Sequence, residues 1–193
     1  MSLLDQLKQS LGNDALQQIS QRLGTDQAST GTAIGAALPV LLGALARNAS
    51  TPSGADALHN ALANDHDGSA LDNISNIVNS SGNIDGSNIL THVLGNKSTM
   101  VANGIGQASG MNASQAGSLL AMLAPIVMGA LGKARSSGNL DAGSLANMLG
   151  QEHQNSNASG AGLGGLMGML DSNHDGSIAD DVIGMASKFF GKK

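Results

Sequence analysis

The chain has 193 residues, a formal net charge of −5 and no cysteine, which excludes disulfides, thiolate metal sites and cysteine catalysis. Its nine lysines and arginines are scattered, whereas a nucleic-acid-binding protein needs a concentrated basic surface. With two Phe, no Trp, no Tyr and 27 Gly, we expect a core of aliphatic residues and Met in helices that approach one another closely.

The first fifty residues predict three helices. A leucine stripe marks a first helix that ends at Gly12, and a second helix ends at Gly24. Thr25 or Asp26 then opens a longer helix, which contains Pro39. Its apolar residues follow the i, i+3, i+4, i+7 pattern: Ile34, Ala37, Leu38, Leu41, Leu42 and Leu45. Because proline removes one backbone hydrogen bond, we expect this helix to be kinked or split in two.

The segment up to residue 95 predicts three shorter helices, after a loop at 48–54. Their apolar stripes lie at residues 57–62, 71–78 and 89–94. A turn at 65–69 separates the first two, and Gly95 ends the last.

The second half of the chain repeats the first at an offset of 86 residues. This offset pairs Pro39 with Pro125 and also aligns several other residues: Ile19 with Ile105, Gly24 with Gly110, Gly43 with Gly129, Ala44 with Ala130, Leu45 with Leu131 and Arg47 with Lys133. One residue further on, Leu58, Asn60 and Leu62 pair with Leu145, Asn147 and Leu149. Common residues also align by chance, but a shared proline inside a long apolar helix favours duplication. We therefore expect an all-α domain with two Pro-kinked apolar helices at its centre.

The last forty residues predict a linker and an appendage. Residues 151–162 are polar and then rich in Gly and Ala, which is typical of a flexible linker. Two apolar stripes flank an acidic stretch further on: Leu163, Leu166, Met167 and Leu170 before it, and Val182, Ile183, Met185, Ala186, Phe189 and Phe190 after it. The predicted organisation is a duplicated helical domain at 1–150, a linker at 151–162 and a C-terminal helix-loop-helix at 163–193.

Two aligned segments carry a resemblance to a known family. Leu-Pro-Val-Leu-Leu-Gly-Ala-Leu at 38–45 and Ala-Pro-Ile-Val-Met-Gly-Ala-Leu at 124–131 resemble the bacterial domain-of-unknown-function family numbered 937. The resemblance covers most of the chain, and some members share a terminal Asp-x-Asn-x-Asp-Gly-Ser loop followed by an apolar helix. It implies a helical bacterial protein without an established activity and supplies no catalytic residues. Some relatives are joined to peptidoglycan-binding domains, and none is recognised in these 193 residues.

The acidic stretch at 171–181 predicts a cation site of the EF-hand kind. Asp171, Asn173 and Asp175 stand at loop positions 1, 3 and 5, and Gly176 takes the turn position. Ser177 would add its backbone carbonyl. Oxygen ligands on a glycine-containing loop favour Ca²⁺, and a cation would relieve the repulsion among the carboxylates.

The end of this loop departs from the EF-hand pattern. Val182 stands where a bidentate Glu closes the site, so Asp180 and Asp181 are rival final ligands. The alternative is an Asp-rich turn that caps the following helix.

Other motifs favour ordinary structural roles. Asp65-His66-Asp67-Gly68-Ser69 repeats part of the acidic loop but has Ala63 at the first ligand position, which favours a plain turn. Residues 160–165 match a dinucleotide fingerprint without the strand that it requires. The five His form no metal-binding pair, and no nucleophile motif is present, so we expect no enzyme. The apolar stretches 33–46 and 119–131 are shorter than a membrane span, so we expect buried core helices.

The sequence thus predicts a non-enzymatic bacterial scaffold or interaction protein with a calcium-binding loop. A protein partner or self-association is expected, without a nucleic-acid or small-molecule ligand. The first eight residues lack the features of a Sec signal, so we expect a cytoplasmic location, with leaderless export or envelope association as open alternatives. The alternative function is a membrane- or envelope-associated self-assembling protein whose Asp-rich loop only caps a helix.

Overall fold

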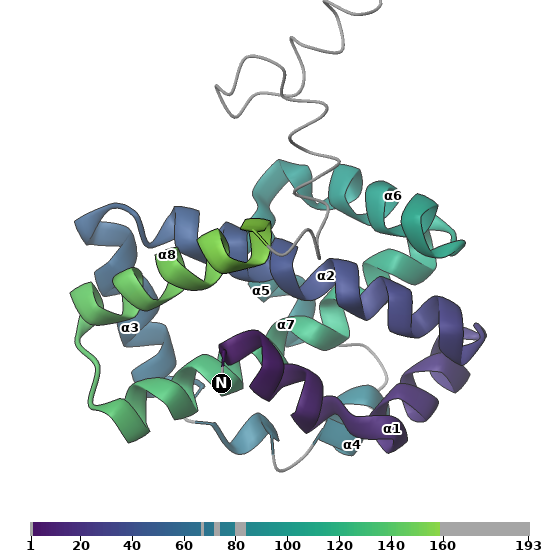
Figure 1. The fold of residues 1–193 in the computed structure, drawn as a ribbon, viewed down its shortest axis with the longest axis horizontal. Coiled ribbons are helices and arrows are strands. Elements are labelled where there is room, and N and C mark those ends of the chain that lie inside the picture. Colours follow the sequence, from purple (N-terminus) through teal and green to yellow (C-terminus); the bar gives the residue numbers. More distant parts are fainter. Residues whose placement is uncertain (1, 67, 72–73, 80–83, 159–193) are drawn as a thin grey trace, which may run out of the picture.

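The computed structural model describes residues 2–66, 68–71, 74–79 and 84–158 (Figure 1). The regular elements of this part are all helical, which confirms the predicted all-α fold. In chain order they are α1 (Leu3–Leu23), α2 (Gln27–Asn48), α3 (Pro52–Asn64), the 3-10 turn η1 (Ser69–Leu71), α4 (Ile74–Asn79), α5 (Ile84–Leu94), the 3-10 turn η2 (Gly95–Lys97), α6 (Ser98–Ser109), α7 (Ala113–Gly138) and α8 (Ala142–Ala158).

The predicted boundaries near the N-terminus follow from backbone chemistry. Gly12 has φ 46° and ψ −179°, so α1 consists of two helical segments that meet at this residue. Gly24 ends α1 in the left-handed conformation, which glycine adopts without a Cβ clash. Asp26 then begins α2, since its carboxylate accepts a hydrogen bond of 2.8 Å from the Ser29 N–H.

Helices α2 and α7 form the centre of the fold and contact each other. Each contains its proline, Pro39 or Pro125, in a buried position, yet α2 runs through 22 residues and α7 through 26. Of the two predicted outcomes, a kinked helix or a split one, the split is therefore wrong: packing around the buried prolines holds each helix together across the missing hydrogen bond. The largest fully buried side chains come mainly from these two helices: Leu38, Leu41, Leu42, Leu119, Leu120, Leu123, Ile126 and Leu131, with Leu7, Ile19, Leu62 and Ile105 from others.

The local structure repeats at the offset found in the sequence. Gly110 ends α6 with φ 77°, as Gly24 ends α1 with φ 65°. Asn112 then caps α7 by accepting from the Gln115 N–H at 2.9 Å, as Asp26 caps α2. The second half of α1 with α2 and α3 thus corresponds to α6, α7 and α8, whereas α4 and α5 follow α3 without a counterpart among the described residues.

The central glycines allow the two repeats to exchange contacts. A Cβ on Gly43 of α2 would lie 2.8 Å from the His153 Nδ1 of α8, and a Cβ on Gly129 of α7 would lie 2.8 Å from the Ala70 Cβ of η1. Both distances are too short for a real Cβ. At Gly43, α2 therefore packs closely against α8, which follows α7 in the chain. At the equivalent Gly129, α7 packs closely against η1, which follows α2 and α3.

The end of α8 corrects the predicted linker. Residues 151–158 are helical, whereas their polar composition predicted a flexible segment. Leu145, Leu149 and Glu152 are buried on one side of this helix, and α8 packs against α2 and α3. Tertiary burial of that face overrides the local polar composition. The remainder of the predicted linker, 159–162, and the predicted helix-loop-helix at 163–193 lie outside the described residues.

Candidate functional site

The predicted metal ligands Asp171, Asn173, Asp175, Ser177, Asp180 and Asp181 all lie outside the described residues. Within the part of the chain that the structure describes, no three His, Asp or Glu side chains come together as a metal site. Of the weaker motif at 65–69, Asp65 ends α3, since its N–H donates to the Ala61 carbonyl at 3.0 Å, Gly68 has φ 109° and Ser69 begins η1, while Asp67 lies outside the described residues.

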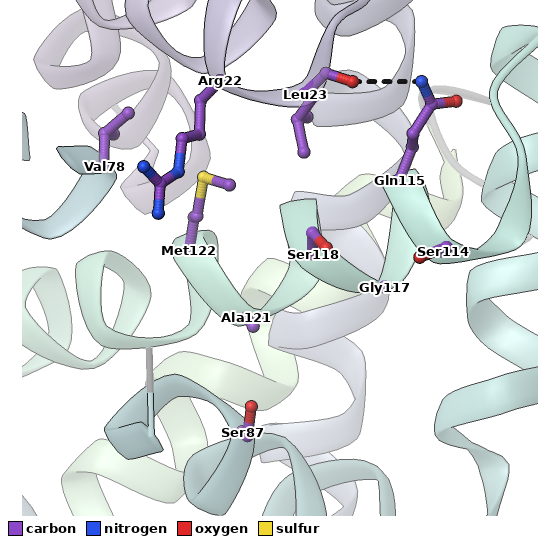
Figure 2. A pocket seen from close by; sticks show the side chains of 10 residues that line it. All are labelled: Arg22, Leu23, Val78, Ser87, Ser114, Gln115, Gly117, Ser118, Ala121 and Met122. Carbon is purple, nitrogen blue, oxygen red and sulfur yellow. Dashed lines mark hydrogen bonds between the residues drawn. The ribbon is translucent and has the colours of Figure 1, made fainter. Parts of the chain in front are cut away.

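A surface groove lies where α7 passes the ends of α1 and α4 and the start of α5 (Figure 2). Its volume is about 520 Å³. We call it the α1–α7 groove, and it is lined by Arg22, Leu23, Val78, Ser87, Ser114, Gln115, Gly117, Ser118, Ala121 and Met122.

Gln115 fixes one end of the α1–α7 groove. Its backbone N–H and side-chain Oε1 form a reciprocal pair with Asn112, with distances of 2.9 and 3.0 Å. Its Nε2 donates to the Leu23 carbonyl oxygen at 3.0 Å, as Figure 2 shows. The start of α7 is thereby tied to the end of α1, and the width of the groove at this end is set by hydrogen bonds.

Small residues allow the neighbouring helices to approach α7 along the groove. A Cβ on Gly86 of α5 would fall against the Ala121 carbonyl group, so only glycine fits there. A Cβ on Gly117 would reach van der Waals distance, 4.0 Å, from the Ala102 Cβ of α6. The α7 face that lines the groove is therefore shallow and close to the backbone.

The groove combines an apolar floor with a polar rim. Val78 and Met122 are buried and Leu23 is half-buried, whereas the rim has exposed hydroxyls at Ser87, Ser114 and Ser118. Arg22, exposed in the last turn of α1, brings a guanidinium to the rim. The lining residues within the described part of the chain include no carboxylate. The described lining thus combines apolar surface, hydroxyls and a guanidinium.

A second, smaller hollow of about 380 Å³ is lined by three ionisable side chains from the described residues, those of His59, Arg135 and Asp141. The Arg135 Nε donates to the His59 Nε2 at 3.1 Å, so this imidazole nitrogen already accepts a hydrogen bond within the protein. Asp141 caps α8 by accepting from the Ser144 N–H at 2.7 Å. The hydrogen bonds from the Ser144 backbone and side chain, with a smaller contribution from His59, lower the pKa of Asp141. These contacts stabilise the junction of α3, α7 and α8.

Within the described part of the chain, two helices satisfy the length and composition of a membrane span. They are Gln27–Asn48 and Ala113–Gly138, so the expectation that both apolar segments are too short to span is wrong. Their apolar windows are 61% and 78% buried within the protein, which is also how the core helices of a soluble protein behave. Length and composition therefore do not decide between the two uses.

The groove has no direct signature in the sequence, because residues of α1, α4, α5 and α7 meet there only in three dimensions. One local signal was available. Asn112 and Gln115 are spaced as a capping pair, and Ser114, Gly117, Ser118 and Ala121 recur at i, i+3, i+4, i+7. This pattern predicts a helix start followed by a small-residue face.

The fold and groove define a repeated all-α protein with a shallow surface groove. The chain belongs to a family described as bacterial protein of unknown function (DUF937), whose profile matches residues 5–134. The match spans α1 to most of α7 and confirms the resemblance seen in the sequence, but it does not reach the acidic loop. No curated protein and no solved structure matches the chain.

Proposed function

We propose that the protein is a non-enzymatic scaffold that binds a partner protein in the α1–α7 groove. The observation that supports this proposal is the composition of the groove, where an apolar floor of Val78 and Met122 lies beneath a rim of hydroxyls and the Arg22 guanidinium. Protein-binding surfaces typically combine a buried apolar centre with a polar rim.

The expected ligand is a peptide segment with an apolar anchor and an acidic residue. The apolar floor suits one or two aliphatic side chains, and the hydroxyls suit backbone groups of the ligand. Arg22 is the charged side chain among the described lining residues, and an acidic residue in the ligand is the complement of its guanidinium. The shallow α7 face favours a chain that lies along the groove.

A binding role agrees better with these side chains than a catalytic one. Among the groove's lining residues that the structure describes, none offers a carboxylate, imidazole or amine to serve as a general base. In the second hollow, the His59 Nε2 accepts from Arg135 and the Asp141 carboxylate accepts from the α8 N-terminus. His59 is thus engaged in a contact between α3 and α7, and Asp141 in the N-terminal cap of α8.

A displayed random-peptide library, selected on the full-length protein, tests the proposal. Selected peptides should be enriched in one acidic residue next to aliphatic residues, and fluorescence anisotropy should show at least about tenfold weaker binding to Ser118→Trp, which fills the groove. Arg22→Glu should weaken the binding of acidic peptides in the same assay. Asn103→Trp on α6 and Arg47→Glu on α2 are matched controls at exposed positions. Equal binding to all four variants would contradict the groove as the binding site.

The alternative is an envelope-associated protein that self-assembles through its apolar helices. The lengths of α2 and α7, 22 and 26 residues, support it. Sedimentation with liposomes and light scattering distinguish the two functions. The scaffold should remain in the supernatant as a monodisperse species, whereas the alternative requires co-sedimentation or large assemblies.

We also propose a structural Ca²⁺ site at 171–181, supported by the ligand spacing of Asp171, Asn173 and Asp175. Calorimetric titration of Ca²⁺ into the full-length protein should show binding that is lost in an Asp171→Ala, Asp175→Ala double variant. The variant Asp56→Ala, Asp65→Ala, which removes two exposed carboxylates from α3 and its C-terminal cap, is the control for net charge. Flat titrations for the wild type would contradict the site.

A further inference from the structure

The two central helices are covered unequally, although they are repeats of each other. On α7, Met122, Ile126 and Ala130 expose 7%, 0% and 7% of their surface. Their counterparts on α2 at the 86-residue offset, Ala36, Val40 and Ala44, are only half-buried. These three residues recur at i, i+4 and i+8, so they form one apolar face, which we call the α2 face.

The difference arises because α4 and α5 cover α7. Val78 of α4 lines the same groove as Met122, and Gly86 of α5 lies against the Ala121 carbonyl. At Gly35, the α2 counterpart of Ala121, an added Cβ would meet no atom within 4 Å. In Figure 1, α2 crosses the side of the molecule that faces the viewer, and α5 lies behind it. The described part of the second repeat contains no counterpart of α4 and α5.

The sequence after α8 contains such a counterpart. Leu163, Leu166 and Met167 repeat the spacing of Ile74, Ile77 and Val78 in α4, at an offset of 89 residues. Asp175-Gly176-Ser177 then repeats Asp85-Gly86-Ser87, the part of α5 that touches α7, at an offset of 90. The offsets 86, 87, 89 and 90 increase steadily along the chain, as small insertions in the second repeat would produce.

The position of α8 brings this segment to the α2 face. His153 lies against Gly43, one residue before Ala44 in α2, and 35 residues follow the end of α8 at Ala158. Leu163 comes five residues after Ala158, the end of α8. Five extended residues span roughly 16 Å, which exceeds the roughly 12 Å between Ala36 and Ala44 along α2.

We infer that residues 163–167 bind the α2 face of the same chain, as α4 binds the equivalent face of α7. Leu163, Leu166 and Met167 then supply the apolar contacts for Ala36, Val40 and Ala44. The docked segment completes the second repeat and shields the more exposed of the two long apolar helices. This inference is independent of the α1–α7 groove and of Ca²⁺ binding.

Disulfide trapping tests the docking directly, because the native chain has no cysteine. Since Val78 and Met122 line one groove, the Val78→Cys, Met122→Cys pair is the reference, and Ala36→Cys, Met167→Cys is its repeat counterpart. We expect an intrachain disulfide in the 36–167 pair, at least about tenfold more than in two controls. These are Ala36→Cys with Gly165→Cys, and Met167→Cys with Asn103→Cys on the exposed side of α6.

Three outcomes of the trapping would overturn the inference. They are no disulfide in the 36–167 pair, equal yields in all pairs, and an interchain disulfide, which would assign the α2 face to a second copy. Hydrogen exchange on full-length protein provides a test without cysteines. Leu163→Asp, Leu166→Asp should speed exchange at residues 36–44 roughly tenfold relative to Gly164→Asp, Gly165→Asp, while residues 122–130 stay unchanged. Equal exchange in the two variants would also overturn it.

Discussion

The Glu152 carboxylate caps the first helix of the chain from a distance of 149 residues: its Oε1 accepts from the Leu3 N–H at 3.0 Å. Its Oε2 accepts from the Leu4 N–H at 3.5 Å. The first N–H groups of a helix have no partner within the helix, and a negative charge there also interacts favourably with the helix dipole. Glu152 is the only glutamate in the chain, and only 9% of its surface is exposed. It therefore joins α8 to α1.

We predict that Glu152→Ala lowers the free energy of unfolding by about 2 kcal/mol, because it leaves the Leu3 and Leu4 N–H groups without their carboxylate partner. Glu152→Gln should lower the free energy of unfolding by less, since an amide oxygen can still accept one of these hydrogen bonds. Urea denaturation followed by far-UV circular dichroism measures both, because the chain has no Trp or Tyr for fluorescence.

Gln154→Ala is the matched control for Glu152→Ala, since Gln154 is exposed on the same helix. Its effect should stay within about 0.5 kcal/mol. If the Glu152 and Gln154 variants unfolded at the same urea concentration, the contact with α1 would contribute nothing measurable to stability.

Much of the fold could be predicted because its signals are local. The apolar stripe around Leu38 and Leu41 identifies α2, and Gly24 marks the end of α1 through its left-handed conformation. Pro39 and Pro125 reveal the repeat. Proline did not split either helix, because the strength of the surrounding packing is not visible in a local pattern.

The groove and the role of Glu152 could not be predicted, because both depend on contacts between distant segments. Glu152 stands in a polar stretch whose composition is typical of a linker, and only its proximity to Leu3 gives it a partner. Similarly, Arg22 and Val78 become neighbours of Met122 through the packing of α1 and α4 on α7. No spacing rule relates these residues in the sequence.

Replacing Gly86 should separate α5 from α7. A Cβ at this position would clash with the Ala121 backbone carbonyl, which cannot rotate away as a side chain can. We predict that Gly86→Ala lowers the free energy of unfolding by about 2 kcal/mol, within the range for overpacking. Thermal unfolding followed by circular dichroism measures the change.

Gly150→Ala is the control for Gly86→Ala, because a Cβ at Gly150 would meet no atom within 4 Å in helix α8. Alanine restricts the unfolded chain and favours helix, so this change should stabilise by roughly 0.5–1 kcal/mol. Opposite signs at the two glycines are expected, and equal stabilisation would show that α5 does not approach α7 so closely.

Three aspartates that begin helices should make stability fall in acid. Hydrogen bonds from Ser2 lower the pKa of Asp5, and hydrogen bonds from Ser29 and Ser144 lower the pKa of Asp26 and Asp141 from the ordinary value of 3.8. Because each pKa is lower in the folded state, the unfolded state binds more protons in acid. Their contribution is therefore present above the ordinary pKa and is lost as the pH falls through 3.8 towards the folded values.

The acid effect can be measured by urea denaturation at a series of pH values from about 5 to about 2. The triple variant Asp5→Asn, Asp26→Asn, Asp141→Asn keeps a capping oxygen at each helix but has no titrating carboxylate, so its stability should depend less on pH. Asp14→Asn, Asp56→Asn, Asp65→Asn removes three other exposed carboxylates as a control. Parallel curves for the wild type and the first variant would contradict the role of the caps.

The end of α7 depends on a left-handed residue that is not glycine. Asn139 has φ 46°, and the Leu140 N–H donates to the Arg135 carbonyl at 3.0 Å, which closes the helix. Since glycine has no Cβ to clash in this conformation, we predict that Asn139→Gly stabilises by a few tenths of a kcal/mol and Asn139→Ala destabilises by about 1 kcal/mol. Thermal unfolding measures the two variants beside Ser137→Ala, an exposed helical control. Arg135 lies one turn before Asn139 and donates a hydrogen bond to His59 of α3. If Asn139→Ala loosens the end of α7, hydrogen exchange in α3 should therefore increase as well. Equal stability of the Gly and Ala variants would show that the backbone conformation at residue 139 does not determine the stability of the end of α7.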